Sequence, residues 1–323
     1  MTSRRCLLLA ALLCAIAGPV AAQTKWPTRT IRIVVPYAPG SSPDVLARLL
    51  TDKLAQRLGQ PVIVDNKPGA GGNTGTDFVA KAAPDGYTFL VSTNGPLVYS
   101  TVFNPKLPYD PFKDLAPVTL AGGQPNVCAV SNDMKVSDVK GWVQAMRDNP
   151  GKYNYSSTGV GSMSHLSVEI LKLKTNSFAV HLPYASSPAA IFAILQGDVQ
   201  FACVPPVAVM PQAKAGKLKA IAVTTATRSA LAPELPTLKE SGFPDIQALA
   251  WMAIMAPAKT PPDIINRMNK EIVAILKEPD TQQKLTTAYM EAIGSTPEEL
   301  TKWMNEERDR WAPVIKHVGL KAE

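Results

Sequence analysis

Residues that could bind an anion gather in five short segments of the sequence, at 37–42, 71–73, 94, 157–165 and 184–186. Hydroxyl, amide and glycine residues predominate there, so the groups on offer are mostly neutral hydrogen-bond donors. Backbone N–H groups and hydroxyls at helix starts satisfy a carboxylate without a buried Lys or Arg. The candidate ligand-binding residues are Tyr37, Gly40, Ser41, Ser42, Gly71, Asn73, Asn94, Ser157, Thr158, Gly161, Ser162, His165, Tyr184 and Ser186.

The first three segments follow predicted β-strands. Residues 31–35 form a β-branched run, Gly40 permits the turn after it, and apolar spacing predicts a helix over 45–58. Strands predicted over 61–64 and 87–93 lead into the next two segments. In an open α/β sheet such loops lie at the carboxyl edge, where ligands bind. We therefore expect these loops to form one wall of an anion site.

The pattern of strand, glycine or serine loop and helix returns in the second half of the chain. Strands predicted over 153–156, 178–181 and 199–204 supply the loops of a second sheet. A broken extended stretch at 121–126 predicts a hinge, and an extended run at 246–255 predicts the return crossing. The predicted organisation is therefore a signal peptide over 1–22, lobe one over 23–123 and 246–323, and lobe two over 124–245.

The remaining segments are predicted from local composition. Residues 97–114, rich in Pro, Asn, Tyr and Asp, are expected to be irregular. Helices are expected near 262–277, 280–290 and 297–317, and in the first and last of these, apolar residues at helical spacing predict core packing.

The N-terminus has the anatomy of a secretory signal peptide. Arg4 and Arg5 precede an apolar core, and small residues end it at Ala22. The arginine pair leaves ordinary secretion and twin-arginine export both open. No later stretch reaches the ~20 apolar residues that a spanning helix needs, so a soluble mature protein is expected.

Charge and cysteine content exclude some classes of protein. The formal charge of +7 falls to about +5 without the two leader arginines, and the bases are scattered, which argues against nucleic-acid binding. Cys128 and Cys203 are the cysteines that remain after the leader. An oxidising compartment allows one bridge between them, but two buried free thiols fit the sequence as well.

Enzymatic and metal-binding alternatives fit less well. Gly159-x-Gly161 and Gly69-x-Gly71 lack the third glycine of a dinucleotide fingerprint. The sequence has no Gly-x-Ser-x-Gly elbow and no His or Cys pair at metal-ligand spacing. No cofactor and no metal are expected. A secreted α/β hydrolase acting on a carboxylate or ester stays open as the alternative. The sequence gives little evidence against a structural adhesin or partner-binding module.

Ordered motifs along almost the whole mature chain resemble the Bug receptors, the periplasmic solute receptors of tripartite tricarboxylate transporters. Individually weak, they are specific in their order and spacing: Trp26-Pro27, Ile31 to Pro36, Gly59 to Val62, Asp65 to Gly72, Pro84 to Thr88, Gly161 to Leu166, Pro183-Tyr184, Ala215 to Leu218, Arg228-Ser229 and Leu235 to Thr237.

The resemblance implies a two-lobed α/β fold of the type II periplasmic-binding-protein kind, with a sheet flanked by helices in each lobe. It implies a non-enzymatic, monomeric receptor in the periplasm that closes on a small carboxylate. It also implies the membrane components of a tripartite transporter as partners.

Two departures from the family pattern bear on the ligand. Ser41 and Ser42 stand where the family usually has glycine, and Pro205-Pro206 stands where many members carry an acid. A ligand ammonium needs such an acid, because burying an unpaired cation is costly. We therefore expect an amine-free ligand: a di- or tricarboxylate, or an aromatic carboxylate if Tyr37 and Tyr184 line an apolar wall.

Overall fold

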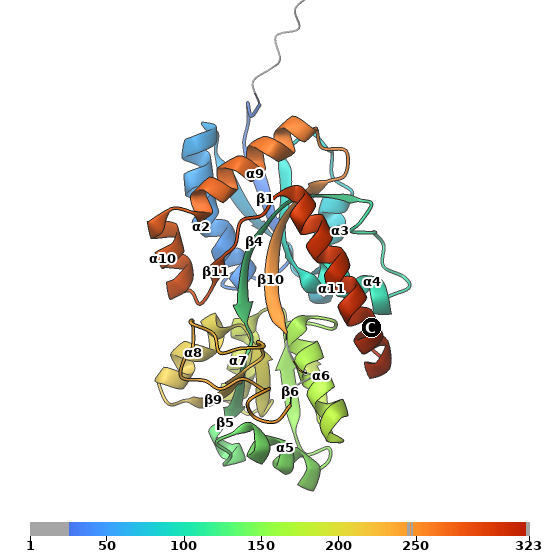
Figure 1. Cartoon of the computed structure of the whole chain (residues 1–323), viewed down its shortest axis with the longest axis vertical. Coiled ribbons are helices and arrows are strands. Elements are labelled where there is room, and N and C mark those ends of the chain that lie inside the picture. Colours follow the sequence, from blue (N-terminus) through green and yellow to red (C-terminus); the bar gives the residue numbers. More distant parts are fainter. Residues whose placement is uncertain (1–25, 244–245, 247, 321–323) are drawn as a thin grey trace, which may run out of the picture.

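The computed structural model describes residues 26–243, 246 and 248–320. It has two lobes, each built on its own sheet (Figure 1). The strand orders are β11-β4-β10-β3-β1-β2 in lobe one and β7-β6-β8-β5-β9 in lobe two. The predicted two-lobed α/β fold is confirmed. The predicted signal peptide lies outside the described residues.

Lobe one is built on a mixed sheet. Strands β1, β2 and β3 run parallel, whereas β4, β10 and β11 pair antiparallel. Helices α2 and α9 pack their apolar residues on one face of the sheet, and α3 and α11 contact the other. The bounds are β1 Ile31–Val35, α2 Ser42–Leu58, β2 Val62–Asn66, η1 Ala70–Gly72, α3 Asn73–Ala80, β3 Thr88–Thr93, η2 Gly95–Tyr99, α4 Ser100–Phe103, β4 Leu115–Pro125, β10 Leu249–Pro257, α9 Pro262–Leu276, α10 Pro279–Thr287, β11 Glu291–Ala292 and α11 Pro297–Val318.

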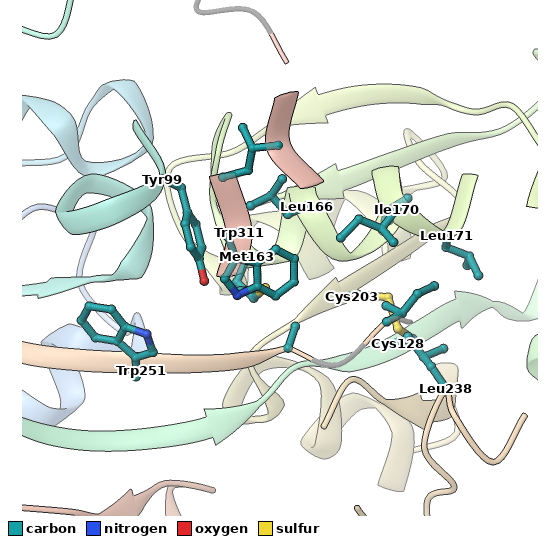
Figure 2. Close-up of a cluster of buried hydrophobic side chains, with 14 of the residues drawn as sticks. Tyr99, Cys128, Met163, Leu166, Ile170, Leu171, Cys203, Leu238, Trp251 and Trp311 are labelled. Carbon is teal, nitrogen blue, oxygen red and sulfur yellow. A yellow bond between two sulfur atoms is a disulfide. The ribbon is translucent and has the colours of Figure 1, made fainter. Parts of the chain in front are cut away.

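Lobe two repeats the arrangement around a five-stranded sheet. Strand β6 runs parallel to β7 and β8, and β5 pairs antiparallel with β8 and β9. A disulfide between Cys128 and Cys203 joins β5 to β8, which resolves the pairing that the sequence left open (Figure 2). The bounds are β5 Val127–Ser131, η3 Asn132–Met134, α5 Val139–Asp148, β6 Asn154–Ser157, α6 Met163–Thr175, β7 Val180–Pro183, α7 Ser187–Gln196, β8 Phe201–Val204, α8 Pro206–Lys214 and β9 Leu218–Val223.

Two extended segments connect the lobes (Figure 1). Strand β4 continues through Asn126 into β5, and the chain returns from β9 to β10. The crossings are tied together, because Thr224 donates its backbone N–H to the Asn126 carbonyl and accepts one from Ala248. The domain boundaries at 123/124 and 245/246 stay predictions.

The long helix α11 belongs to lobe one by sequence but reaches lobe two. A capping box begins it: the Thr296 hydroxyl accepts from the Glu299 N–H, and the Glu299 carboxylate accepts from the Thr296 N–H. Trp311 and Ile315 of α11 share one apolar cluster with Leu166 of α6 (Figure 2). The helix therefore contacts both lobes.

Four local features differ from expectation. The segment predicted to be irregular at 97–114 includes most of η2 and all of α4. Strand β4 runs on through the stretch where a break was predicted, with a shift in its pairing register at Ala121. Its glycines leave room for β11, because a Cβ on Gly122 would lie 2.9 Å from the Glu291 carbonyl. Helix α8 and strand β11 were not predicted. In α8, Pro206 stands at a first helical position, where the missing N–H costs nothing.

Within the described residues we find no helix whose length and hydrophobicity would let it span a bilayer.

Candidate functional site

A small cavity of about 50 Å³ lies between the lobes, where the loops at the carboxyl ends of both sheets meet. We call it the inner cavity. Lobe one contributes residues that follow β1 and β3 and residues of the crossing strands, and lobe two contributes the starts of three helices. Its walls are Tyr37, Ser41, Ser42, Pro43, Thr93, Asn94, Gln124, Asn126, Thr158, Ser162, Met163, Ser164, Ser186, Ser187, Pro205, Ala250, Trp251 and Met252.

Four helices direct their N-termini at this cavity. The residues preceding α2, α6, α7 and α8 are Ser41, Ser162, Ser186 and Pro205, and all four line the inner cavity. The Ser162 hydroxyl accepts from the His165 N–H, and the Ser186 hydroxyl from the Ala189 N–H. Free N–H groups and the positive pole of the helix dipole favour an anion at such a place.

Several polar groups of the inner cavity have no hydrogen-bond partner within the described residues. They are the hydroxyls of Ser41, Ser42 and Ser187, the amide oxygen of Gln124 and both ends of the Asn126 amide. All five residues are buried. Leaving a buried polar group unpaired costs about 1–3 kcal/mol. Groups of this kind are normally satisfied, so those that line the inner cavity can pair with a solute or with water.

No charged side chain of the described chain lines the inner cavity. Asp44, which lies near the start of α2, is used elsewhere: its carboxylate accepts from the Gly40 N–H and the Asn66 amide at 2.9 Å and from Arg48 Nε at 3.0 Å. Burial raises the pKa of Asp44, but the hydrogen bonds from Arg48, Gly40 and Asn66 outweigh it and hold the pKa below its usual value. The donors that remain for an anion are therefore neutral.

A larger cavity of about 280 Å³, the outer cavity, adjoins the inner one. Tyr37 and Thr158 line both cavities. The Tyr37 hydroxyl lies 3.1 Å from the Gly71 carbonyl, to which it donates, and 2.8 Å from the Thr93 hydroxyl. Burial raises the pKa of Tyr37 to about 12, so the ring stays neutral. Tyr37 therefore lies where the two cavities meet, and the Gly71 carbonyl and the Thr93 hydroxyl hold its phenol in place.

The structure brings together ten of the fourteen predicted site residues around these cavities. Gly71, Asn73 and Tyr184 line the outer cavity alone. The inner cavity takes Tyr37, Ser41, Ser42, Asn94, Thr158, Ser162 and Ser186. Gly40, Ser157, Gly161 and His165 line neither cavity. That any of them binds ligand stays a prediction.

The four residues outside the cavities support the loops instead. The Gly161 N–H donates to His165 Nδ1 at 3.1 Å, and the His165 ring stacks on His181 with 3.9 Å between centroids. His181 Nε2 lies 2.6 Å from the Ser157 hydroxyl. Burial lowers the pKa of both histidines to about 3. Ser157 is fully buried, and its hydroxyl lies 3.2 Å from the Gly159 carbonyl, to which it donates.

The sequence did not single out several lining residues. Gln124 and Asn126 lie at the crossing that was predicted as a hinge, so their position between the lobes was the available signal. Ser187 directly follows the predicted Ser186. Trp251 sits in a predicted apolar strand and offered no signal of its own.

Known proteins resemble this chain over nearly its whole length. Residues 46–320 match the family described as the tripartite tricarboxylate transporter family receptor, TctC. The Bordetella pertussis protein BugT is 35% identical over 307 residues, covering 95% of this chain and 94% of BugT.

Solved structures are similar as well. The R. palustris protein Rpa4515, solved with adipate, is 32% identical with a TM-score of 0.88, covering 92% of this chain and 99% of that one. MatC from Rhodopseudomonas palustris, solved with bound malate, is 31% identical with a TM-score of 0.85, covering 90% and 100%.

Proposed function

The chain belongs to the tripartite tricarboxylate transporter receptor family, and from that premise we propose that it captures a small carboxylate in the inner cavity between its lobes. The solute is bound and released unchanged, so no catalysis is involved. The receptor acts in the periplasm and delivers the ligand to the membrane components of a tripartite transporter. In this proposal lobe one comprises 23–123 and 246–323, and lobe two 124–245.

The composition of the inner cavity carries the proposal. Helix N-termini and unpaired hydroxyls converge there from both lobes, without a charged side chain among the described lining residues. This is an environment for a small anion held by neutral donors. It offers no carboxylate to an ammonium group, which supports an amine-free ligand. Relatives solved with malate and adipate support a carboxylate as the anion.

Thermal shift against a carboxylate library tests the proposal. A ligand that binds only the folded protein stabilises it by about 2.7 kcal/mol at a concentration of 100 Kd, which raises the melting temperature by several degrees. We expect at least one amine-free di-, tri- or aromatic carboxylate to do so. A library in which no carboxylate moves the melting temperature, or in which one is chemically converted, would contradict the proposal.

A pair of serine variants tests the location. Ser42→Ala removes a buried hydroxyl that has no protein partner, so the affinity for the carboxylate should fall about tenfold while the stability of the free protein holds. Ser131→Ala is the matched control, since its buried hydroxyl is also without a partner in the described chain but lies on β5, outside the inner cavity. Equal loss of affinity in both variants would contradict the placement.

A further inference from the structure

A buried carboxylate on α11 contacts Trp251, which lines the inner cavity, and Tyr99, which contacts the lining residue Asn94. Glu307 is only 3% exposed. Its Oε2 lies 2.8 Å from the Tyr99 hydroxyl and 3.0 Å from Trp251 Nε1, while Arg310 contacts its Oε1. An indole N–H can only donate, so Oε2 is an acceptor. The proton of the Tyr99 hydroxyl must therefore point to Glu307 as well.

This arrangement fixes the orientation of Asn94. The Tyr99 hydroxyl has given its one proton to Glu307, so toward Asn94, 3.1 Å away, it can only accept. The backbone carbonyl of Leu249, also an acceptor, lies 3.0 Å from the same side-chain atom of Asn94. Both neighbours require the amide nitrogen at that place. Asn94 therefore cannot flip, although asparagine amides are often ambiguous.

The amide oxygen is the polar group that Asn94 has left for the inner cavity. Asn94 lines that cavity, and no hydrogen bond within the described chain reaches its oxygen. On strand β4, opposite Ala250, Gln124 adds a buried amide oxygen that also lacks a partner there. The fixed amide oxygen of Asn94 is therefore an acceptor in a cavity whose helix N-termini supply donors. An anion satisfies the donors, but acceptors need a hydrogen-bond donor from the ligand.

We propose that Glu307, acting through Tyr99, is a positioning residue that makes the inner cavity select hydroxycarboxylates, whose hydroxyl donates to the Asn94 amide oxygen. The inference rests on the proposed function and narrows its ligand class. A hydroxyl is preferred to an ammonium, because no carboxylate of the described chain lines the cavity and a buried cation would stay unpaired.

Three acids with one carbon skeleton test the selectivity. Malate, succinate and aspartate carry a hydroxyl, a hydrogen and an ammonium at the same carbon. By calorimetry at neutral pH, malate should bind the unaltered protein at least about tenfold more tightly than either of the others. Equal affinities for malate and succinate, or tighter binding of aspartate, would overturn the inference.

Two variants test the role of Glu307. Glu307→Gln supplies an amide that can donate to Tyr99, so the Tyr99 proton can turn to Asn94 and favour the flipped amide against the Leu249 carbonyl. Tyr99→Phe removes one of the two acceptors that hold the Asn94 amide nitrogen and leaves the Leu249 carbonyl. In Glu307→Gln the affinity for malate should fall to within about threefold of that for succinate, with a smaller fall in Tyr99→Phe, while succinate binding stays nearly constant in both. Parallel weakening of both acids would show a merely structural role and overturn the inference. Glu306→Gln, an exposed neighbour on the same helix, should leave the ratio unchanged.

The two proposals fail in different ways. If carboxylates without a hydroxyl bind but neither malate nor any other hydroxycarboxylate does, the hydroxyl inference is overturned and the receptor function stands. If no carboxylate of any size binds, the proposed function is overturned and the inference with it.

Discussion

The stacked rings of His165 and His181 connect the loop at 157–162 to the core of lobe two. Between them they contact Gly161 and Ser157, at either end of that loop. Glu169 lies 3.8 Å from His165 Nε2 and would favour a charged ring, but Lys172 lies 2.6 Å from Glu169 and opposes it. Burial dominates, so both pKa values are lowered from 6.5 to about 3 and the native rings are neutral.

This pair predicts acid sensitivity. The unfolded rings take up protons near pH 6.5 that the native rings refuse, so the free energy of unfolding falls as the pH drops from 6.5 toward 3. Between pH 7 and pH 5 each ring should remove about 2 kcal/mol. Urea titrations at the two pH values measure this loss. His181→Asn should lose about 2 kcal/mol less than the unaltered protein over the same interval; an identical loss would contradict the assignment.

Residue types in loops indicated most of the residues that line the two cavities, because the loops that follow parallel strands lie at one edge of the sheet. They did not predict Gln124, Asn126 or Glu307. Amide side chains occur in many exposed stretches, so their residue type alone does not indicate a site. Gln124 and Asn126 line the inner cavity because the crossing strands place them there. Glu307 lies in a helix rich in charged residues, so only the fold distinguishes this buried carboxylate from its exposed neighbours.

Among the elements of lobe two, β5 and β8 are joined by the disulfide between Cys128 and Cys203, which closes a loop with a sequence separation of 75. Restricting the unfolded chain over a loop of that length is worth about 4 kcal/mol in the chain-entropy description. The Cys128→Ala, Cys203→Ala double variant should therefore unfold at a clearly lower urea concentration. A loss below about 1 kcal/mol would contradict this view of the bridge.

Apolar periodicity predicted the long helices but not α4 and β11. Helices α9 and α11 are long enough for their buried apolar residues to recur at helical spacing, so the sequence alone reveals them. Helix α4 has four residues and β11 two, so neither is long enough for a periodic signal. In α8, Pro205 and Pro206 end β8 and at the same time begin the helix, and the sequence analysis recognised only the first of these roles.

At the scale of the whole molecule, the two lobes meet through backbone at the rim of the cavities. A Cβ on Gly71 of lobe one would lie 2.8 Å from the Val160 carbonyl of lobe two, and one on Gly159 would lie 2.5 Å from the Gly71 Cα. The Ala38 N–H donates to the Ala185 carbonyl across the same gap. Contacts this close leave no room for a side chain at Gly71 while the lobes are together.

Gly71→Leu should therefore prevent closure. We expect a carboxylate that shrinks the radius of gyration of the unaltered protein in solution scattering to leave the variant at its ligand-free value, with binding lost in calorimetry. Gly71 has φ +64, so a side chain there also strains the backbone by about 1 kcal/mol.

Gly216→Leu separates the two effects, backbone strain and blocked closure, since Gly216 has φ +70 but nothing within 4 Å of its Cβ position. This control should show a similar drop in melting temperature and still close on the ligand. Closure and unchanged affinity in Gly71→Leu would mean that the lobes do not meet at Gly71 when ligand is bound.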